Sequence, residues 1–352
     1  MMHAPITHQA STHQAWARFA LIGALSLVFV GCSMLGKQTD FADAVTSSGV
    51  GPFRPLAPEE LGGSDALGGL RGVGRASEIP GALFFDLGGA FEAAQEGDEG
   101  EEIAPDLFRA RPHELGCASY RGMELALSPK EAWEGSRLFD PFVRAESDGS
   151  LELYYAGETG IGLARAADDR AAFSRVGDGL ILEGARRSPS VIRDETLGEI
   201  LYFEEAGRVY AAKRDGEFTL ADEEPVVDLF PGGSDDPLDD EIRHASPFAI
   251  VGEMPSGRRT VRLYFVSIRA GGDRHLMMAA SEDGVRFERS PFPVLNLKPA
   301  SAGAPSVRLD EDGVTHLFYI EDAARGQLMR AVSPLETWFL GHPEIDSSAC
   351  DG

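Results

Sequence analysis

The chain has 352 residues, of which 43% are hydrophobic and 25% charged, a composition typical of a soluble protein with one large domain or two average ones. Its formal net charge of −25 disfavours binding to nucleic acid and to anionic lipid, because both are polyanions. The 41 glycines and 21 prolines favour many short elements joined by turns over long helical bundles.

The N-terminal residues have the features of an export signal. Residues 1–18 contain no acid, and an apolar run of 12 residues follows, from Phe19 to Val30. A membrane-spanning helix needs roughly 20 apolar residues, so a run of this length fits the core of a signal peptide. The sequence Phe29-Val30-Gly31-Cys32 resembles a bacterial lipobox. We therefore expect residues 1–31 to be a lipoprotein signal peptide and Cys32 to carry the lipid; an ordinary signal peptide with an incidental cysteine is the alternative.

The residues after Cys32 predict location and linkage. Ser33 stands where lipoproteins retained in the inner membrane have Asp, so the resemblance implies the cell envelope and its outer membrane. The stretch 32–78 is rich in Gly, Ser, Pro and Asp and is typical of a flexible tether. Cys117 and Cys350 remain, and in an oxidising envelope we expect them to form a disulfide.

Beyond the tether, one pattern recurs four times. Similar phrases begin at Asp140, Ser188, Ser246 and Ala304, spaced by 48, 58 and 58 residues. Each phrase leads into an aromatic-rich strand and then a strand of small residues, and several units continue with a fourth strand. A period of about 40 to 60 residues with four strands per unit is typical of a β-propeller.

A fifth, weaker unit is expected upstream of the four. Its first strand would lie at Ile79–Leu87, and Met123–Trp133 would hold its third strand and the exit from it. The fold class is thus all-β, a five-bladed β-propeller over residues 79–345 followed by a C-terminal tail, 346–352. A β-sandwich with coincidental phrases is the alternative.

The repeated phrase resembles the five-bladed propellers of the arabinanase, β-xylosidase, invertase and levansucrase superfamily. That resemblance implies three acidic residues around the propeller axis, on the innermost strands of successive blades, as base or nucleophile, proton donor and modulator. Asp140, before Pro141, stands where the base typically occurs. The matching openings hold Ser188, Ser246 and Ala304 instead, and the Glu that usually precedes a proline as the acid is absent.

Further site candidates come from residues near these openings. Glu241, in an acidic insertion, could reach the funnel mouth and act as the acid; an exposed acidic loop is the alternative. His244 could orient a sugar, act as an acid or fill a polar core. Arginines lining the funnel would suit an anionic sugar, unless neighbouring acids pair with them. The candidate catalytic residues are therefore Asp140, Glu241 and His244, and the candidate binding residues are Arg187, Arg243, Ser188 and Ser246.

No motif predicts a metal site or a cofactor, since G-x-S-x-G, H-E-x-x-H, C-x-x-C and phosphate-binding loops are absent from the sequence. The sequence thus predicts a lipid-anchored envelope protein whose glycosidase-like propeller binds a glycan or a protein partner without a complete set of catalytic carboxylates. An active glycoside hydrolase using Asp140 with an unconventionally placed acid is the alternative. A purely structural lipoprotein is a third possibility.

Overall fold

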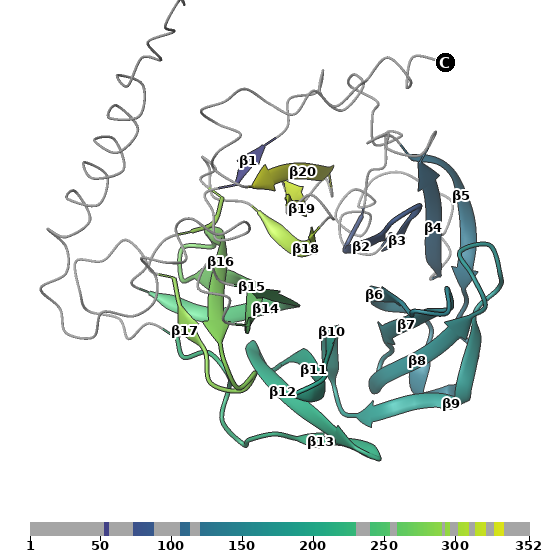
Figure 1. Ribbon diagram of the computed structural model, residues 1–352, viewed down its shortest axis with the longest axis horizontal. Coiled ribbons are helices and arrows are strands. Elements are labelled where there is room, and N and C mark those ends of the chain that lie inside the picture. The colour runs from purple at the N-terminus through teal and green to yellow at the C-terminus, as the bar shows by residue number, and fades with distance from the viewer. Residues whose placement is uncertain are drawn as a thin grey trace, which may run out of the picture. The chain divides into compact units, whose positions relative to one another are not determined.

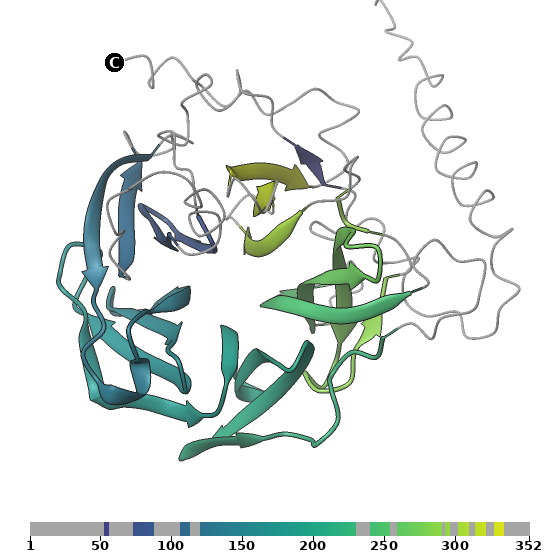
Figure 2. The same ribbon diagram turned by 180° about the vertical axis from the view of Figure 1, so that it is seen from behind.

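The chain folds into five four-stranded antiparallel sheets arranged in a ring, as the computed structural model shows from both sides (Figures 1 and 2). The structure describes residues 53–55, 73–87, 106–112, 120–229, 240–253, 259–290, 293–295, 302–309, 314–321 and 327–333. The innermost strands contact one another in the order β2, β6, β10, β14, β18 and back to β2. The five-bladed β-propeller predicted from the repeats is therefore confirmed.

The blades follow one another along the chain. Blade 1 comprises β2 (Ala76–Ile79), β3 (Ala82–Asp86), β4 (Leu107–Pro112) and β5 (Tyr120–Leu127). A 3₁₀ helix, η2 (Ala132–Glu134), precedes blade 2, which comprises β6 (Phe139–Ala145), β7 (Leu151–Ala156), β8 (Gly160–Ala166) and β9 (Ser174–Glu183). Blade 3 comprises β10 (Arg186–Asp194), β11 (Gly198–Glu205), β12 (Arg208–Asp215) and β13 (Glu217–Leu220). Blade 4 comprises β14 (Glu241–Glu253), β15 (Arg259–Arg269), β16 (Arg274–Ser281) and β17 (Glu288–Arg289).

The last blade is completed by the N-terminal side of the chain. Blade 5 comprises β18 (Gly303–Leu309), β19 (Thr315–Glu321), β20 (Gln327–Ser333) and β1 (Arg54–Pro55). β1 pairs antiparallel with β20, with Arg54 opposite Val332, so the first described strand becomes the outermost strand of the last blade. This pairing joins the two ends of the propeller sequence and closes the ring.

Blade 1 and the tether differ in detail from the sequence prediction. Within the range 32–78 expected to be a tether, the structure places β1 and the start of β2. Ile79 ends the innermost strand of blade 1 instead of opening it. Residues from Met123 to Leu127 lie in β5, the outermost strand, where a third strand was predicted.

The core lies between the blades, and the second strand of each blade supplies its largest side chains. A blade has a neighbour on both faces, so residues that point to opposite sides of a strand are both buried. All six residues of β7 are buried for this reason, without an exposed polar face. Aromatic pairs that are less than 2% exposed occupy the same place in all five blades: Phe84 and Phe85, Tyr154 and Tyr155, Tyr202 and Phe203, Tyr264 and Phe265, Phe318 and Tyr319.

The innermost strands all begin at one side of the ring, which we call the opening face. In four blades the residue before a proline has a positive φ, between 46° and 53°, and a break in register accompanies it. Left-handed backbone at a non-glycine residue costs of order 1 kcal/mol, so its fourfold recurrence marks an equivalent position. The four residues are Asp140, Ser188, Ser246 and Ala304.

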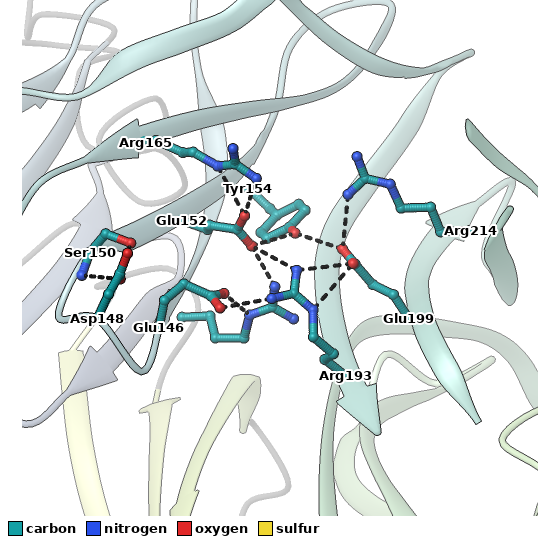
Figure 3. Close-up of polar contacts among 10 residues, drawn as sticks. Glu146, Asp148, Ser150, Glu152, Tyr154, Arg165, Arg193, Glu199 and Arg214 are labelled. Atoms are coloured by element: carbon teal, nitrogen blue, oxygen red, sulfur yellow. Dashed lines mark hydrogen bonds and ion pairs between the residues drawn. The ribbon is translucent and has the colours of Figure 1, made fainter. Parts of the chain in front are cut away.

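On the opposite side of the ring, a network of ion pairs joins blades 2 and 3 (Figure 3). The hydroxyl of Tyr154 lies between two carboxylates that share its one proton as acceptors, Glu152 of blade 2 at 2.9 Å and Glu199 of blade 3 at 3.0 Å. Four arginines surround these two carboxylates and that of Glu146: Arg144, Arg165, Arg193 and Arg214. On this side of the ring, the boundary between blades 2 and 3 is thus occupied by mutually paired charges.

Candidate functional site

Each of the five innermost strands brings one residue to the opening face near the axis of the propeller, and we call these five residues the opening ring. In blade 1, Ser77 pairs with Phe84 as Ser190 pairs with Tyr202 in blade 3, so Arg75 occupies the place of Ser188. The opening ring therefore consists of Arg75, Asp140, Ser188, Ser246 and Ala304. Among these five described residues only Asp140 is acidic, and Asp140 and Ser246 are half-buried where the other three are buried.

Three carboxylates near the ring accept backbone N–H groups from the next blade. Asp86, at the end of β3, accepts from the amide of Asp140 at 2.6 Å and from that of Arg75 at 3.2 Å. Asp140 in turn accepts from the amide of Ser188 at 3.0 Å. Glu204, at the corresponding place in β11, accepts from the amide of Ser246 at 3.2 Å. These bonds join blade 1 to blade 2, blade 2 to blade 3, and blade 3 to blade 4.

Asp86 and Asp140 form a close acidic pair with different surroundings. Asp86 is only 3% exposed, and its burial, together with the charge of Asp140, raises its pKa to about 7. A charged carboxylate is disfavoured both by low polarity and by a neighbouring charge of the same sign. Asp86 therefore titrates near neutral pH, a behaviour that in other proteins accompanies either a constrained structural acid or a proton donor.

Arg75 crosses the axis of the propeller. Its Nη2 donates to the backbone carbonyl of Pro247 in blade 4, at 2.8 Å, although blades 1 and 4 are not neighbours in the ring. The side chain is fully buried, and its guanidinium lies 5.8 Å from the ring centre of Phe248. Burial lowers the pKa of Arg75, while the charges of Asp140, Asp86 and Glu204 oppose that effect. Within the described part of the chain, its Nε and Nη1 have no hydrogen-bond partner.

The two arginines that the sequence predicts to bind ligand are Arg187 and Arg243. Both lie at the opening face, in different settings. The guanidinium of Arg187 stands 3.7 Å from the ring centre of Phe139, the residue before Asp140, and is half-buried. Arg243 is exposed and donates to Glu204 at 2.5 Å. Arg243 is thus paired with a neighbouring acid, which was the alternative to ligand binding, while Arg187 contacts an aromatic ring.

Glu241 and His244 contact each other in a buried cluster on blade 4. Their carboxylate and Nε2 are 3.2 Å apart, and neither side chain is exposed. Arg289 donates twice to Glu241, at 2.7 Å each time, and Ser267 donates to it as well. Burial lowers the pKa of His244. The structure thus places the predicted acid neither in an exposed loop nor at the surface of a funnel mouth.

Three residues at the ring were not singled out as site residues from the sequence: Arg75, Asp86 and Phe139. Asp86 had a signal, because Leu83-Phe84-Phe85-Asp86 aligns with Leu201-Tyr202-Phe203-Glu204. Arg75 lay in the range assigned to the tether.

Cys32, Cys117 and Cys350 lie outside the described residues, so their predicted lipidation and disulfide stay predictions. Within the described ranges no cluster suits a metal ion, and no helix is long and apolar enough to cross a membrane.

Comparison with solved structures identifies the class of fold. The chain has the fold of family-43 glycoside hydrolases, five-bladed propellers of the superfamily that the repeated phrase resembles. No family model matches the sequence, and no curated protein matches it either.

Three solved structures illustrate the likeness. An endo-arabinase from Bacteroides thetaiotaomicron is 13% identical with a TM-score of 0.53, covering 76% of this chain and 95% of its own. A thermostable family-43 glycoside hydrolase is 15% identical with a TM-score of 0.53, covering 76% and 90%. The GH43_1 enzyme from Xanthomonas citri is 17% identical with a TM-score of 0.52, covering 85% and 93%. At these identities the likeness concerns the fold.

Proposed function

We propose that this protein is a lipid-anchored cell-envelope protein whose propeller binds a glycan at the opening ring without hydrolysing it. The anchor would be Cys32, and the expected location is the outer membrane. The fold supports a carbohydrate ligand because the structurally similar proteins are glycoside hydrolases. Since fold alone does not set function, the proposal depends on the residues of the ring.

The observation that carries the proposal is how the acidic side chains are used. Hydrolysis of a glycosidic bond takes a proton donor and a second carboxylate, about 5–9.5 Å apart and both accessible to the sugar. Asp86 is buried, and both of its oxygens accept backbone N–H groups. Glu204 is 8% exposed and is shared between an amide and Arg243. Of these three carboxylates, Asp140 is the one that is half-buried and open to an incoming sugar, which supports binding over catalysis.

The residues around Asp140 suit a polar ligand. Ser246 and Arg187 are half-buried at the same face, and a guanidinium donates directional hydrogen bonds to sugar hydroxyl or carboxylate oxygens. We expect Arg187→Ala to weaken glycan binding about tenfold or more, as the loss of a charged hydrogen bond does. Arg170→Ala is the matched control, because Arg170 is exposed in the loop between β8 and β9, on the opposite side of the ring.

The test is a binding screen on defined oligosaccharides, including arabino-oligosaccharides, with the full mature chain in detergent. Binding without release of sugar supports the proposal. Failure of every glycan to bind would refute it, and capture of one envelope protein instead would point to a protein partner. Metabolic labelling with a fatty acid, absent in Cys32→Ser, tests the anchor.

An active glycoside hydrolase has one observation in its favour. Asp86 and Asp140 are adjacent carboxyls, and the raised pKa of Asp86 would leave it partly protonated at neutral pH, as a proton donor must be. This hypothesis predicts sugar release that disappears in Asp140→Asn. Its difficulty is geometric, because Asp86 is only 3% exposed and both of its oxygens are held by backbone amides, so an incoming sugar does not reach its carboxyl.

A further inference from the structure

A recess lies on blade 2, at the opening face. It is an open hollow of about 440 Å³. The turn between β7 and β8 and the end of β9 both reach the opening face, because β6 starts there and the strands alternate in direction. The residues that line the hollow are Trp133, Glu158, Thr159, Leu180, Glu183, Gly184 and Ala185.

Hydrogen bonds hold the walls of this hollow in place. The amide and the hydroxyl of Thr159 both donate to the carbonyl of Trp133, at 3.1 and 3.2 Å. The indole Nε1 of Trp133 donates to the carbonyl of Asp178 at 3.1 Å, and the amide of Gly184 donates to the carbonyl of Thr159 at 2.9 Å. The hollow is therefore formed before any ligand binds, which spares the entropy of ordering it.

Two glycines make room for the indole. A Cβ at Gly162 would lie 2.4 Å from Cη2 of Trp133, and one at Gly157 would lie 2.8 Å from its Cζ3. The indole also stacks on Tyr155, with ring centres 5.6 Å apart and an angle of 26° between the planes. Trp133 is nevertheless half-buried rather than buried, so part of a rigidly seated indole borders the hollow.

We propose that this hollow, the Trp133 hollow, is a second saccharide subsite that takes an uncharged sugar residue. The indole and Leu180 offer apolar surface to the C–H face of a sugar, and a rigid aromatic ring contributes contact area at little entropic cost. The exposed carboxylates of Glu158 and Glu183 accept hydrogen bonds from sugar hydroxyls. The same carboxylates repel a uronate, so the subsite selects against acidic sugars.

The Trp133 hollow adjoins the opening ring along the chain. Ala185 lines the hollow, and Ser188 of the opening ring follows three residues later. At a maximum of about 3.6 Å per residue, their Cα atoms lie within about 11 Å of each other. One oligosaccharide can therefore place one sugar in the opening ring and another in the Trp133 hollow. The inference rests on the proposed function, because it takes the opening ring to bind the first of these sugars.

The experiment measures how affinity depends on chain length. Di- to hexasaccharides of the arabino, xylo and manno series are titrated by calorimetry against the full mature chain, with oligogalacturonides as the acidic probe. We expect the longer neutral oligosaccharides of one series to bind about tenfold more tightly than its disaccharide, the scale of one aromatic contact. Trp133→Ala abolishes this gain and leaves disaccharide affinity unchanged. Leu309→Ala is the matched control and keeps the gain, because Leu309 is an exposed apolar residue at the end of β18, on the side of the ring away from the opening face.

The outcomes separate this inference from the proposed function. A gain with length that survives in Trp133→Ala overturns the subsite and leaves the ring as the binding site. Absence of binding by every saccharide overturns both. A preference for oligogalacturonides at the hollow overturns the assignment to an uncharged sugar. Because Trp133→Ala can loosen the fold, Glu158→Gln with Glu183→Gln is the second variant, and it must raise the affinity for oligogalacturonides at least severalfold.

Discussion

Replacing Glu152 by glutamine tests whether the ion network between blades 2 and 3 stabilises the ring. Glu152 is 2% exposed, and it accepts hydrogen bonds from Arg165, at 2.6 and 3.0 Å, and from Arg144. The hydroxyl of Tyr154 donates to it at 2.9 Å (Figure 3). Burial by itself would raise the pKa of Glu152, but the hydrogen bonds from Arg165 and the charge of Arg144 prevail and lower it to about 2.

The lowered pKa sets the size of the effect. The difference between the ordinary value of 4.5 and about 2 corresponds to about 3 kcal/mol of stability. A carboxyl whose pKa is lower in the folded state contributes this stability above its unfolded pKa and loses it as pH falls towards 2. We therefore expect the free energy of unfolding of Glu152→Gln to be about 3 kcal/mol lower than that of the wild type at pH 7.

Urea unfolding followed by tryptophan fluorescence measures this difference, at several pH values from 7 down to 3. The gap between wild type and variant should narrow as the pH falls. Glu195→Gln is the matched control, because Glu195 is an exposed glutamate in the turn between β10 and β11 of the same pair of blades. If the free energy of unfolding of Glu152→Gln lies within about 0.5 kcal/mol of that of the wild type at pH 7, the network contributes no more than exposed ion pairs do, and the reasoning is refuted.

Three further predictions concern single contacts between and within blades. The raised pKa of Asp86 means that its ionisation opposes folding, so its contribution to the free energy of unfolding is greatest below pH 4 and falls by about 2 kcal/mol between pH 5 and 7. Urea unfolding of the wild type and of Asp86→Asn at several pH values measures this fall, and an equal pH dependence in both proteins would contradict it. Ser77→Ala removes the acceptor of the buried amide of Val143, 3.0 Å away, and should lower the free energy of unfolding by about 1–3 kcal/mol in the same assay. Gly162→Ala places a Cβ against Trp133 and should cost about 1–3 kcal/mol while changing the near-ultraviolet circular dichroism of the indole, which an unchanged spectrum would refute.

The fold could be predicted because each blade repeats the same packing requirement. The second strand of a blade is buried on both faces and therefore needs a continuous apolar and aromatic run. Such runs recur along the sequence at intervals close to the number of residues in one blade. The closing strand could not be predicted in the same way. Arg54 and Pro55 are two residues without periodicity, and their pairing with β20 depends on where the end of the ring comes to lie. Long-range closure leaves little local signal.

The same distinction explains the candidate site. Asp140, Ser188 and Ser246 were found because the residue before the proline of an inner strand carries a repeated signal, and the structure places all three in the opening ring. Glu241 was assigned to a loop that could bend towards the axis. Instead β14 begins at Glu241, which pairs with Arg269 at the end of β15, and this long hairpin holds the carboxylate against Arg289. Extension of a strand pair depends on partners that are distant in the sequence.

Two of the carboxylates at the ring hold equivalent places in their blades. Asp86 and Glu204 occupy one place in their blades, the residue after the aromatic pair, and each accepts the opening amide of the next blade. In blade 2 that place holds Ala156, which has no acceptor side chain. Asp140 of the same blade supplies the missing acceptor from the ring itself, to Ser188. The hydrogen bond to Ser188 thus gives Asp140 a role in joining blades 2 and 3, beside the role of base that the superfamily resemblance implies.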